Sequence, residues 1–495
     1  MTSSATTVSL HGHAVPTGLH IAGQWEGSSR RLDVTDPSHG STIGSVADAT
    51  PADAVRALDA AADAQREWAR WTPRARAELF HRAYDLLEER ADAFADVMTL
   101  ESGKPRTESV AEFALSMGFF RWFAEQIAHL HGTYAPSTTG PFRVITTVKP
   151  VGPALLVTPW NFPMLMNARK GGAALAAGCT VILKSAKETP FTAALFVQTL
   201  ADAGFPPGVV NLLHTSDSAA LTAPMMADRR LRKVSFTGST KTGSLLLGQA
   251  ASSIMSASME LGGDGPFIVL DDADVDLAVR EALVCKFRNA GQACVSANRI
   301  ILHEAIAEEF TEKFLRGVAG LTVGNGFDSQ TTVGPLISLA QRERVVRLID
   351  DFRASGAAEL LAGGSSVAGD GFFFEPTVMR FTTADHPLCN EEIFGPVAAL
   401  YTVRSAREAL TVANDTPYGL AAYLFTSNVS RMILLAEELD FGMVGVNRGV
   451  MAEPSAPFGG VKASGLGREG GHDALHDFLE PQYIALTVTE ADTLD

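Results

Sequence analysis

The chain has 495 residues, of which 46% are hydrophobic and 19% charged, and this composition excludes a disordered, collagenous or low-complexity protein. Its 56 acidic residues outnumber its 40 basic ones, which gives a net charge of −16 at pH 7. A surface of this sign repels nucleic acid and anionic lipid, so neither is an expected partner. An anionic ligand would need positive side chains gathered around it.

Neither the cysteines nor the N-terminus indicates export. The cysteines, at 179, 285, 294 and 389, form no C-x-x-C pair, so neither a disulfide framework nor a zinc or iron–sulfur site is expected. Residues 1–16 lack the basic and apolar regions of a signal peptide. The longest weakly polar run, 171–183, is too short to span a bilayer. We therefore expect a cytoplasmic protein without a metal and without a membrane partner.

The first half of the chain predicts helices and then a strand. Over residues 51–130, Ala and Leu recur at spacings of three and four, which predicts long helices. The sequence Glu-Ser-Gly-Lys-Pro at 101–105 interrupts that pattern as a turn. Residues 142–148 are rich in β-branched side chains and predict a strand.

From residue 153 short apolar strands alternate with helices. The strands are expected at 154–158, 181–184, 209–213 and 233–237, and the helices near 165–178, near 190–203 and from 240 onward. This order predicts an α/β fold with a parallel, doubly wound sheet and helices on both of its faces. A second α/β stretch runs from about 266 to 445, and the tail at 483–489 predicts a strand that pairs with 142–148 or with another subunit.

Four short segments carry residues suited to catalysis or to ligand binding. Cys294 follows Gly-Gln-Ala and is a candidate nucleophile, because a thiolate is favoured near helix N-termini and cations; an inert buried cysteine is the alternative. Glu260, ahead of two glycines, could act as a general base or be an ordinary salt-bridged carboxylate. Asn161, after a strand, could donate to an oxyanion or satisfy backbone groups of a turn. The run 236–243 opens a helix and could bind a phosphate, although it is not G-x-G-x-x-G.

Together these segments closely resemble the aldehyde dehydrogenase superfamily, in order and spacing, from about residue 20 to 490. Further matches lie at 101–104, 391–397 and 457–465. The resemblance implies a doubly wound dinucleotide-binding domain, an α/β catalytic domain and a small β arm for oligomerisation. We place the first at 1–127 and 151–262, the second at 263–463, and the arm at 132–150 and 478–495. The arm would pair with a neighbouring subunit in a homodimer or homotetramer.

The resemblance also implies the chemistry, which is NAD(P)-dependent oxidation of a small-molecule aldehyde. Cys294 would form a thiohemiacetal and then a thioester, Asn161 would stabilise the oxyanion, and Glu260 would activate the hydrolytic water, with Lys170 and Glu469 on a proton path from that base. The positions aligned with cofactor contacts are Thr158, Pro159, Trp160, Lys184, Ser185, Lys187, Gly238, Ser239, Glu392 and Phe394. An inactive scaffold of the same fold is the alternative of a different class, and the intact catalytic residues argue against it.

Lys187 departs from the pattern of many NAD-preferring relatives, which carry a glutamate there that accepts hydrogen bonds from the adenosine ribose. With Lys184 nearby, Lys187 would attract a 2′-phosphate, so we expect NADP to be preferred and NAD to be possible. The alternative is that Lys187 points to solvent. Lys241 also stands where relatives usually carry glutamate; it could add positive charge near the pyrophosphate or lie on the surface.

Arg169 and Arg288 stand where relatives that oxidise apolar aldehydes carry aromatic or apolar residues. Two guanidinium groups suit bidentate binding of a carboxylate, and the pair is similar to the clamp of succinate-semialdehyde dehydrogenases. Succinate semialdehyde is therefore the expected substrate, with Phe162 in the same pocket. The alternative is that one or both arginines pair with acidic residues inside the fold.

The loop 448–456 lacks a serine that often helps to hold the carboxylate in that subfamily. Arg448 could replace this contact or admit a longer acid, so glutarate and 2-oxoglutarate semialdehydes remain open. An uncharged or aromatic aldehyde is the other alternative, in a pocket lined by Phe120, Trp160, Phe162 and Leu165. Ser296 stands where some members carry a second cysteine, so the corresponding disulfide switch cannot form.

Overall fold

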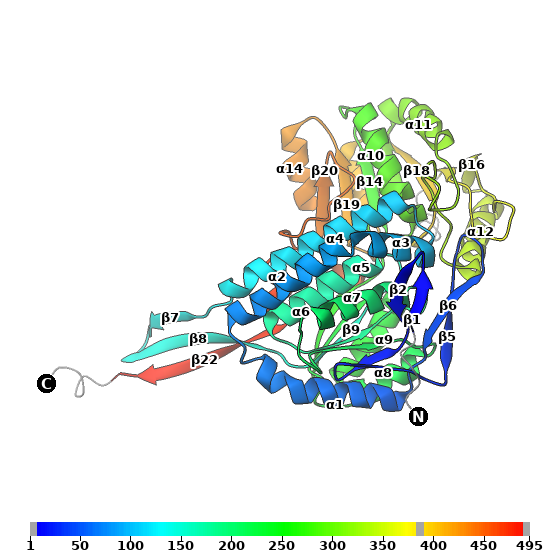
Figure 1. Cartoon of the computed structure of the whole chain (residues 1–495). Helices are drawn as coiled ribbons and strands as arrows, with labels where there is room; N and C mark the ends of the chain where they lie inside the picture. The colour runs from blue at the N-terminus through cyan, green and yellow to red at the C-terminus, as the bar shows by residue number, and fades with distance from the viewer. Residues whose placement is uncertain (1–6, 383–390, 489–495) are drawn as a thin grey trace.

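The computed structural model describes residues 7–382 and 391–488. Within these residues the secondary structure gathers into two large sheets with flanking helices and a small sheet that projects from the body as an arm (Figure 1). Cys389 and Thr489, the last residue of the predicted tail strand, lie outside the described residues. No helix in the described part is long and apolar enough to cross a membrane.

The helices expected over residues 51–130 are present. They are α1 (Pro51–Trp68), α2 (Pro73–Glu89), α3 (Ala91–Ser102), α4 (Arg106–Gln126) and the 3₁₀ turn η1 (Ile127–His129). The turn between α3 and α4 requires glycine, because Gly103 has a φ of 76° and a Cβ there would lie 2.4 Å from a carbon of Pro335. The break predicted from the sequence is therefore built by a left-handed residue in a crowded place.

The first large sheet has the strand order β21-β13-β12-β9-β10-β11-β3-β4. Its strands are β3 (Leu19–Ile21), β4 (Gln24–Glu26), β9 (Ala154–Val157), β10 (Val181–Lys184), β11 (Val210–Leu213), β12 (Lys233–Thr237), β13 (Ser256–Glu260) and β21 (Gly465–Leu466). The strands from β13 to β11 run parallel, as predicted. The prediction was wrong for the edges, because an N-terminal hairpin and a short strand from the far end of the chain join them antiparallel. Two further hairpins, β1 (Thr7–Leu10) with β2 (His13–Pro16) and β5 (Arg31–Thr35) with β6 (Thr42–Ala47), were not predicted.

Both faces of this sheet are buried in separate cores. Leu156 and Leu183 belong to one core, and their chain neighbours Leu155 and Ile182 belong to the other, since successive strand residues point to opposite faces. The flanking helices are α5 (Pro163–Met166), α6 (Gly172–Ala177), α7 (Pro190–Asp202), α8 (Ser218–Met226) and α9 (Thr240–Ala251). Between α5 and α6 the helix expected near 165–178 contains a π-helical segment, η2 (Asn167–Gly171).

The second large sheet runs β16-β17-β18-β15-β14-β19-β20 and is parallel except at β16. Its strands are β14 (Gly265–Val269), β15 (Ala297–His303), β16 (Ala358–Ala362), β17 (Thr377–Phe381), β18 (Val397–Val403), β19 (Ala421–Phe425) and β20 (Met443–Val446). Its helices are α10 (Val275–Phe287), α11 (Glu304–Ala319), α12 (Leu339–Ser355), α13 (Ala406–Asn414) and α14 (Val429–Glu438). This is the second α/β stretch that the sequence predicted.

The arm consists of β7 (Thr133–Pro136), β8 (Phe142–Pro150) and β22 (Leu479–Thr487). The tail strand β22 pairs antiparallel with β8 along its whole length, from Leu479 opposite Pro150 to Thr487 opposite Phe142. Of the two pairings left open by the sequence, the one within the chain is therefore present. Figure 1 shows the arm extending well away from the body.

Candidate active site

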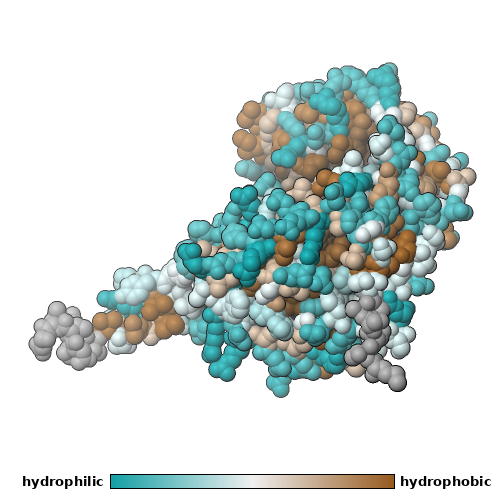
Figure 2. Space-filling view, in the orientation of Figure 1, coloured by the Kyte–Doolittle hydropathy of each residue, from teal (hydrophilic) through white to brown (hydrophobic). Residues whose placement is uncertain are grey.

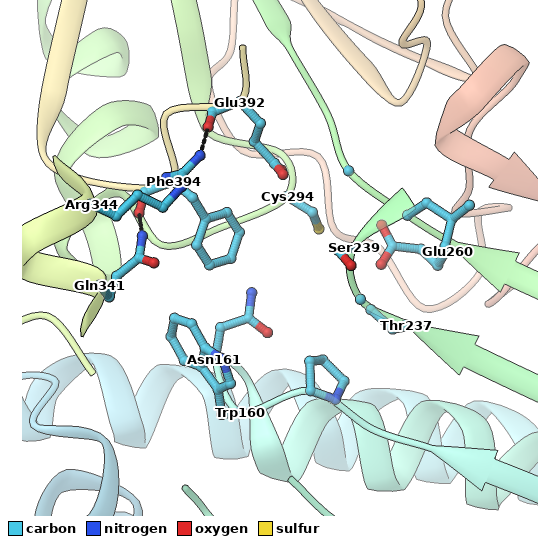
Figure 3. Close-up of a pocket in the computed structure, with 14 residues that line it drawn as sticks. Trp160, Asn161, Thr237, Ser239, Glu260, Cys294, Gln341, Arg344, Glu392 and Phe394 are labelled. Atoms are coloured by element: carbon cyan, nitrogen blue, oxygen red, sulfur yellow. Dashed lines mark hydrogen bonds between the residues drawn. The ribbon is translucent and has the colours of Figure 1, made fainter. Parts of the chain in front are cut away.

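The site lies where the first sheet faces the second. Adjacent parallel strands β9, β12 and β13 end at the same edge of the first sheet, so the residues that follow them lie close together. They meet the Cys294 turn in a cavity of about 280 Å³ (Figure 3). The cavity is lined by Pro159, Trp160, Asn161, Thr237, Gly238, Ser239, Glu260, Leu261, Gly262, Cys294, Gln341, Arg344, Glu392 and Phe394. The structure thus brings Cys294, Glu260 and Asn161 to one place.

Cys294 lies in a turn between the segment η3 (Arg288–Gly291) and β15, and not at the start of a helix. The turn is built by a left-handed run: φ is 51° at Asn289, 53° at Ala290 and 71° at Gly291. A Cβ on Gly291 would lie 2.1 Å from the carbonyl oxygen of Gly395, so glycine is required there. Non-glycine residues in this conformation cost of order 1–3 kcal/mol each and are typical of functional sites.

The Asn161 side chain is held by its surroundings. Its Oδ1 accepts a hydrogen bond from the Phe162 N–H at 3.1 Å, and its Nδ2 donates to the carbonyl oxygen of Gln292 at 3.1 Å. The Asn161 carbonyl oxygen accepts hydrogen bonds from Lys104 Nζ (2.6 Å) and from Asn289 Nδ2 (3.1 Å). An amide nitrogen carries two protons, so the second N–H of Asn161 stays available to a ligand.

Glu260 is the last residue of β13 and is 2% exposed, and its carboxyl group faces the Cys294 thiol. Burial, and then the negative charge of Glu469, raise the pKa of Glu260 to about 7. A carboxyl with this pKa can exchange protons near neutral pH, as a general base must.

Burial and the neighbouring Glu260 charge raise the pKa of the Cys294 thiol well above its usual value. This direction favours the neutral thiol and is opposite to the lowered pKa that is typical of cysteines at helix N-termini. The thiol must lose its proton before it can attack the aldehyde.

Behind the base lies a buried charge cluster. Lys170 Nζ donates to Glu469 Oε1 and, at 3.0 Å, to Ser235 Oγ. Arg169 Nε lies 2.6 Å from Glu469 Oε2. Burial alone would raise the pKa of Glu469, but the charges of Lys170 and Arg169 hold it below its usual value. Both cations reach the same carboxylate although they are consecutive residues, and both belong to the π-helical η2.

A second cavity, of about 210 Å³, shares Cys294 with the first. Its walls are formed by Thr107, Glu108, Ala111, Glu112, Leu115, Phe162, Leu165, Met166, Arg169, Arg288, Cys294, Val295, Ala452 and Phe458. Both predicted clamp arginines therefore face one pocket next to the nucleophile. Arg288 forms no ion pair with a described residue, and its guanidinium lies 5.5 Å from the centre of the Phe162 ring.

The other predicted substrate residues need correction. Arg169 pairs with Glu469 and stacks on Phe458, 4.0 Å from the ring centre, so the alternative of an internal ion pair applies to this residue. Arg448 does not line the pocket: its side chain is exposed, and its Nε donates to the carbonyl oxygen of Val450 at 2.7 Å. Phe120 is fully buried and stacks on Phe80 at 4.6 Å, away from the pocket.

A third cavity, of about 480 Å³, continues from the first across the end of the first sheet. Of the predicted cofactor residues it is lined by Thr158, Pro159, Trp160, Lys184, Lys187 and Gly238, and Ser239, Glu392 and Phe394 line the cavity at Cys294. Ser185 lines neither of these two cavities, because its side chain is buried and its Oγ bonds to His214 Nδ1 at 2.7 Å.

These residues fit a dinucleotide. Lys184 is 6% exposed, has no ion-pair partner among the described residues, and has a pKa that burial lowers to about 8. Such an ammonium favours a hydroxyl or phosphate partner. Ser239 caps the N-terminus of α9, where backbone N–H groups favour phosphate. Glu392 Oε1 accepts from the Gly263 N–H at 3.0 Å, which points its carboxylate at the cavity.

Sequence reasoning missed several residues of the site. Gln341 on α12 donates to the carbonyl oxygen of Phe394 at 2.7 Å, and Arg344 donates to the carbonyl oxygens of Ile393 (2.7 Å) and Glu392 (2.5 Å). They so hold the 392–394 segment, and Figure 3 draws the bonds to Phe394 and Glu392. They belong to no motif, and only the tertiary structure places them here. Within the described residues, no group of three or more His, Cys, Asp or Glu side chains could hold a metal ion.

Comparison with known proteins agrees with this geometry. A model of the aldehyde dehydrogenase family matches residues 25–484. The succinate-semialdehyde dehydrogenase of Paenarthrobacter nicotinovorans is 45% identical over 90% of this chain and 98% of its own length. The 3-sulfolactaldehyde dehydrogenase of Pseudomonas putida is 42% identical over 94% of this chain and 96% of its own. The crystal structure of succinate-semialdehyde dehydrogenase from Burkholderia pseudomallei has a TM-score of 0.93 and 40% identity, covering 96% of this chain and 98% of that one.

The fold and the comparisons define an oxidoreductase that oxidises aldehydes with NAD(P). The chain belongs to the aldehyde dehydrogenase family, and the α/β fold implied by the resemblance is confirmed.

Proposed function

We propose that this enzyme oxidises succinate semialdehyde to succinate. The observation that carries the proposal is Arg288, a guanidinium without an ion-pair partner among the described residues, in the wall of the pocket that ends at Cys294. An unpaired cation at the edge of an apolar cavity calls for an anionic ligand. The pocket volume of about 210 Å³ suits a short aldehyde. The names of the most similar relatives support a short, negatively charged aldehyde.

The proposed chemistry begins at Cys294, whose thiolate adds to the aldehyde carbon. The resulting oxyanion accepts hydrogen bonds from the free Asn161 N–H and from the Cys294 backbone N–H, and one such donor is typically worth about 3 kcal/mol. The bound dinucleotide supplies the acceptor for the hydride that leaves this carbon. A thioester remains on Cys294, and Glu260 takes a proton from the water that hydrolyses it. Lys170 and Glu469 carry that proton onward from the base.

The substrate proposal is tested by removing Arg288. The Arg288→Leu variant should lower kcat/KM for succinate semialdehyde by about 100-fold, because truncating one partner of a buried charge pair costs 2 kcal/mol or more. Its kcat/KM for butanal, which has no carboxylate, should change only a few-fold. Arg448→Leu is the matched control and should alter neither value by more than about twofold, since its side chain lies outside the pocket. Equal losses for both aldehydes in the Arg288 variant would contradict the proposal.

Longer semialdehydes and uncharged aldehydes are the remaining candidates. Phe162, Leu165 and Phe458 give part of the pocket an apolar wall. A steady-state panel of succinate, glutarate and 2-oxoglutarate semialdehydes, hexanal and benzaldehyde, each with both dinucleotides, ranks them. A higher kcat/KM for hexanal or benzaldehyde than for succinate semialdehyde would contradict the proposal that the substrate carries a carboxylate.

We further propose that NADP is preferred over NAD. Lys184 and Lys187 line the same cavity and would both attract a 2′-phosphate. A negative charge opposes this attraction, because Glu188 also lines the cavity and lies 3.9 Å from Lys187. Since Lys187 is 60% exposed, its contribution is modest and the preference should be partial.

The Lys187→Glu variant is therefore expected to lower the NADP-to-NAD ratio of kcat/KM by about tenfold, the size of one charged hydrogen bond. Lys241→Glu makes the same charge change at an exposed position of α9 that does not line the cavity. It should leave the ratio within about twofold. A ratio that is unchanged in the Lys187 variant would show that this side chain faces solvent in the complex.

The arm supports our proposals on assembly and organisation. Ile484 and Leu486 on β22 and Val488 just after it are 39–48% exposed, and Figure 2 shows apolar side chains gathered on the projecting arm. Such a surface suits pairing with another copy of the chain, so we propose a homodimer or homotetramer.

The separate sheets support a division into a cofactor domain (1–127 and 151–262), a catalytic domain (263–463) and an arm (132–150 and 478–495). A reactive free thiol favours a reducing compartment, and we propose the cytoplasm.

A further inference from the structure

Glu108, a residue without a role so far, lies in the wall of the substrate pocket. It stands in the first turn of α4, is partly buried, and lines the same cavity as Arg288 and Cys294. Its Oε2 accepts a hydrogen bond from the Asn289 N–H at 2.8 Å, and its other oxygen has no partner among the described residues. The pocket proposed to receive an anion therefore already contains a carboxyl group.

The charges of the pocket can be assigned pairwise. Glu112 pairs with Lys104 at 2.6 Å, and Arg169 pairs at 2.6 Å with Glu469, which Lys170 also contacts. Among the residues that line the pocket, Arg288 and Glu108 are the charges without an ion-pair partner in the described part of the chain.

When Glu108 is ionised, it balances Arg288 in the empty pocket. A substrate carboxylate that enters then adds a second negative charge beside a single guanidinium. An uncompensated charge in a buried pocket makes the binding free energy less favourable. The balance is restored if Glu108 takes up a proton, because Arg288 then faces the single charge of the ligand. A protonated carboxyl is also a hydrogen-bond donor, and a carboxylate is a strong acceptor.

We propose that Glu108 couples binding of the anionic substrate to the uptake of a proton: the ligand carboxylate and one proton enter together, and the Glu108 carboxylic acid donates a hydrogen bond to the carboxylate held by Arg288. Burial raises the pKa of Glu108 to about 7, against the opposing charges of Lys104 and Arg288, so the proton is accessible near neutral pH. Glu112 acts in the same direction as burial, and Asn289 faces Glu108 as a neutral donor. Affinity should then be highest below pH 7 and fall as the free enzyme loses this proton above it.

The coupling rests on the proposed function, and the test separates the two. Calorimetric titrations use the full-length protein saturated with dinucleotide, in two buffers of different ionisation enthalpy. The ligands are succinamate, an unreactive analogue in which an amide replaces the aldehyde, and butyramide, in which a methyl group replaces the carboxylate of succinamate. With a pKa of about 7, succinamate should bring about 0.9 proton into the complex at pH 8 and about 0.1 at pH 6. Its Kd should rise about tenfold between these pH values.

Glu108→Gln is the decisive variant, because glutamine keeps an oxygen acceptor for the Asn289 N–H and carries no titrating proton. Proton uptake at pH 8 should vanish and Kd should become independent of pH. Glu125→Gln, an exposed change on the same helix, is the matched control and should keep the uptake. Absence of uptake by the unaltered enzyme, or equal uptake by the Glu108 variant, would overturn the coupling while leaving the preference for a carboxylate intact. If succinamate and butyramide bind equally well, the proposed function and the coupling both fail.

Discussion

Replacing Cys294 with alanine is expected to lower kcat by at least about 10⁴-fold, because the thioester that links hydride loss to hydrolysis can then not form. The variant should still bind dinucleotide, since the cavity that continues toward Lys184 does not include this residue. Mass spectrometry of the unaltered enzyme, quenched during turnover, should find an acyl adduct on the peptide that contains Cys294.

Cys179→Ala is the control for that experiment. This cysteine is fully buried and lines none of the three cavities described above. Its loss should leave kcat within about twofold. Normal turnover by the Cys294 variant would contradict the proposal of a covalent intermediate on this residue.

Replacing Glu260 with glutamine should separate the two halves of the reaction. Hydrolysis should slow by about 10²–10⁴-fold, the usual size of a general-base contribution, so the thioester accumulates. Reduced dinucleotide should then appear as a burst equal to the enzyme concentration, followed by a slow phase. A slow phase as fast as in the unaltered enzyme would show that another group activates the water.

The pH dependence of hydrolysis follows from the same residue. A general base acts only when it has lost its proton, and the pKa of Glu260 is raised to about 7. The rate of thioester hydrolysis should therefore rise with pH through about 7 and level off above it. In the Glu260→Gln variant this rise should be absent, which pre-steady-state measurements with a limiting aldehyde can establish.

The alternation of strands and helices in the sequence was enough to predict the parallel sheet and the edge at which the site lies. The strands that carry Glu260 and precede Asn161 alternate with helices in the way that requires a parallel sheet, and parallel strands end at one edge. The resemblance then supplied the roles of Cys294, Glu260 and Asn161, which the residues alone had left open. Their meeting in one cavity agrees with those roles.

What the sequence did not predict depends on side chains that meet across the fold. The pairing of Arg169 with Glu469 joins residues 300 positions apart in the sequence, and periodicity does not reveal the π-helical segment that carries Arg169. Glu108 stands in the first turn of a helix, where an acidic residue is ordinarily explained by the helix dipole. Ser185 is bound by His214 from a neighbouring strand end, a partner that only the sheet order supplies.

The contact between Gly291 and the carbonyl of Gly395 leaves no space between two segments with different tasks. One bears the sulfur and the other bears Glu392 and Phe394, which line the same cavity as Cys294. Because these two backbones are in direct contact, a shift of residues 392–395 toward Gly291 would displace the turn that carries Cys294. A change at Glu392 or Phe394 would thereby reach the nucleophile through the backbone, without any intervening side chain.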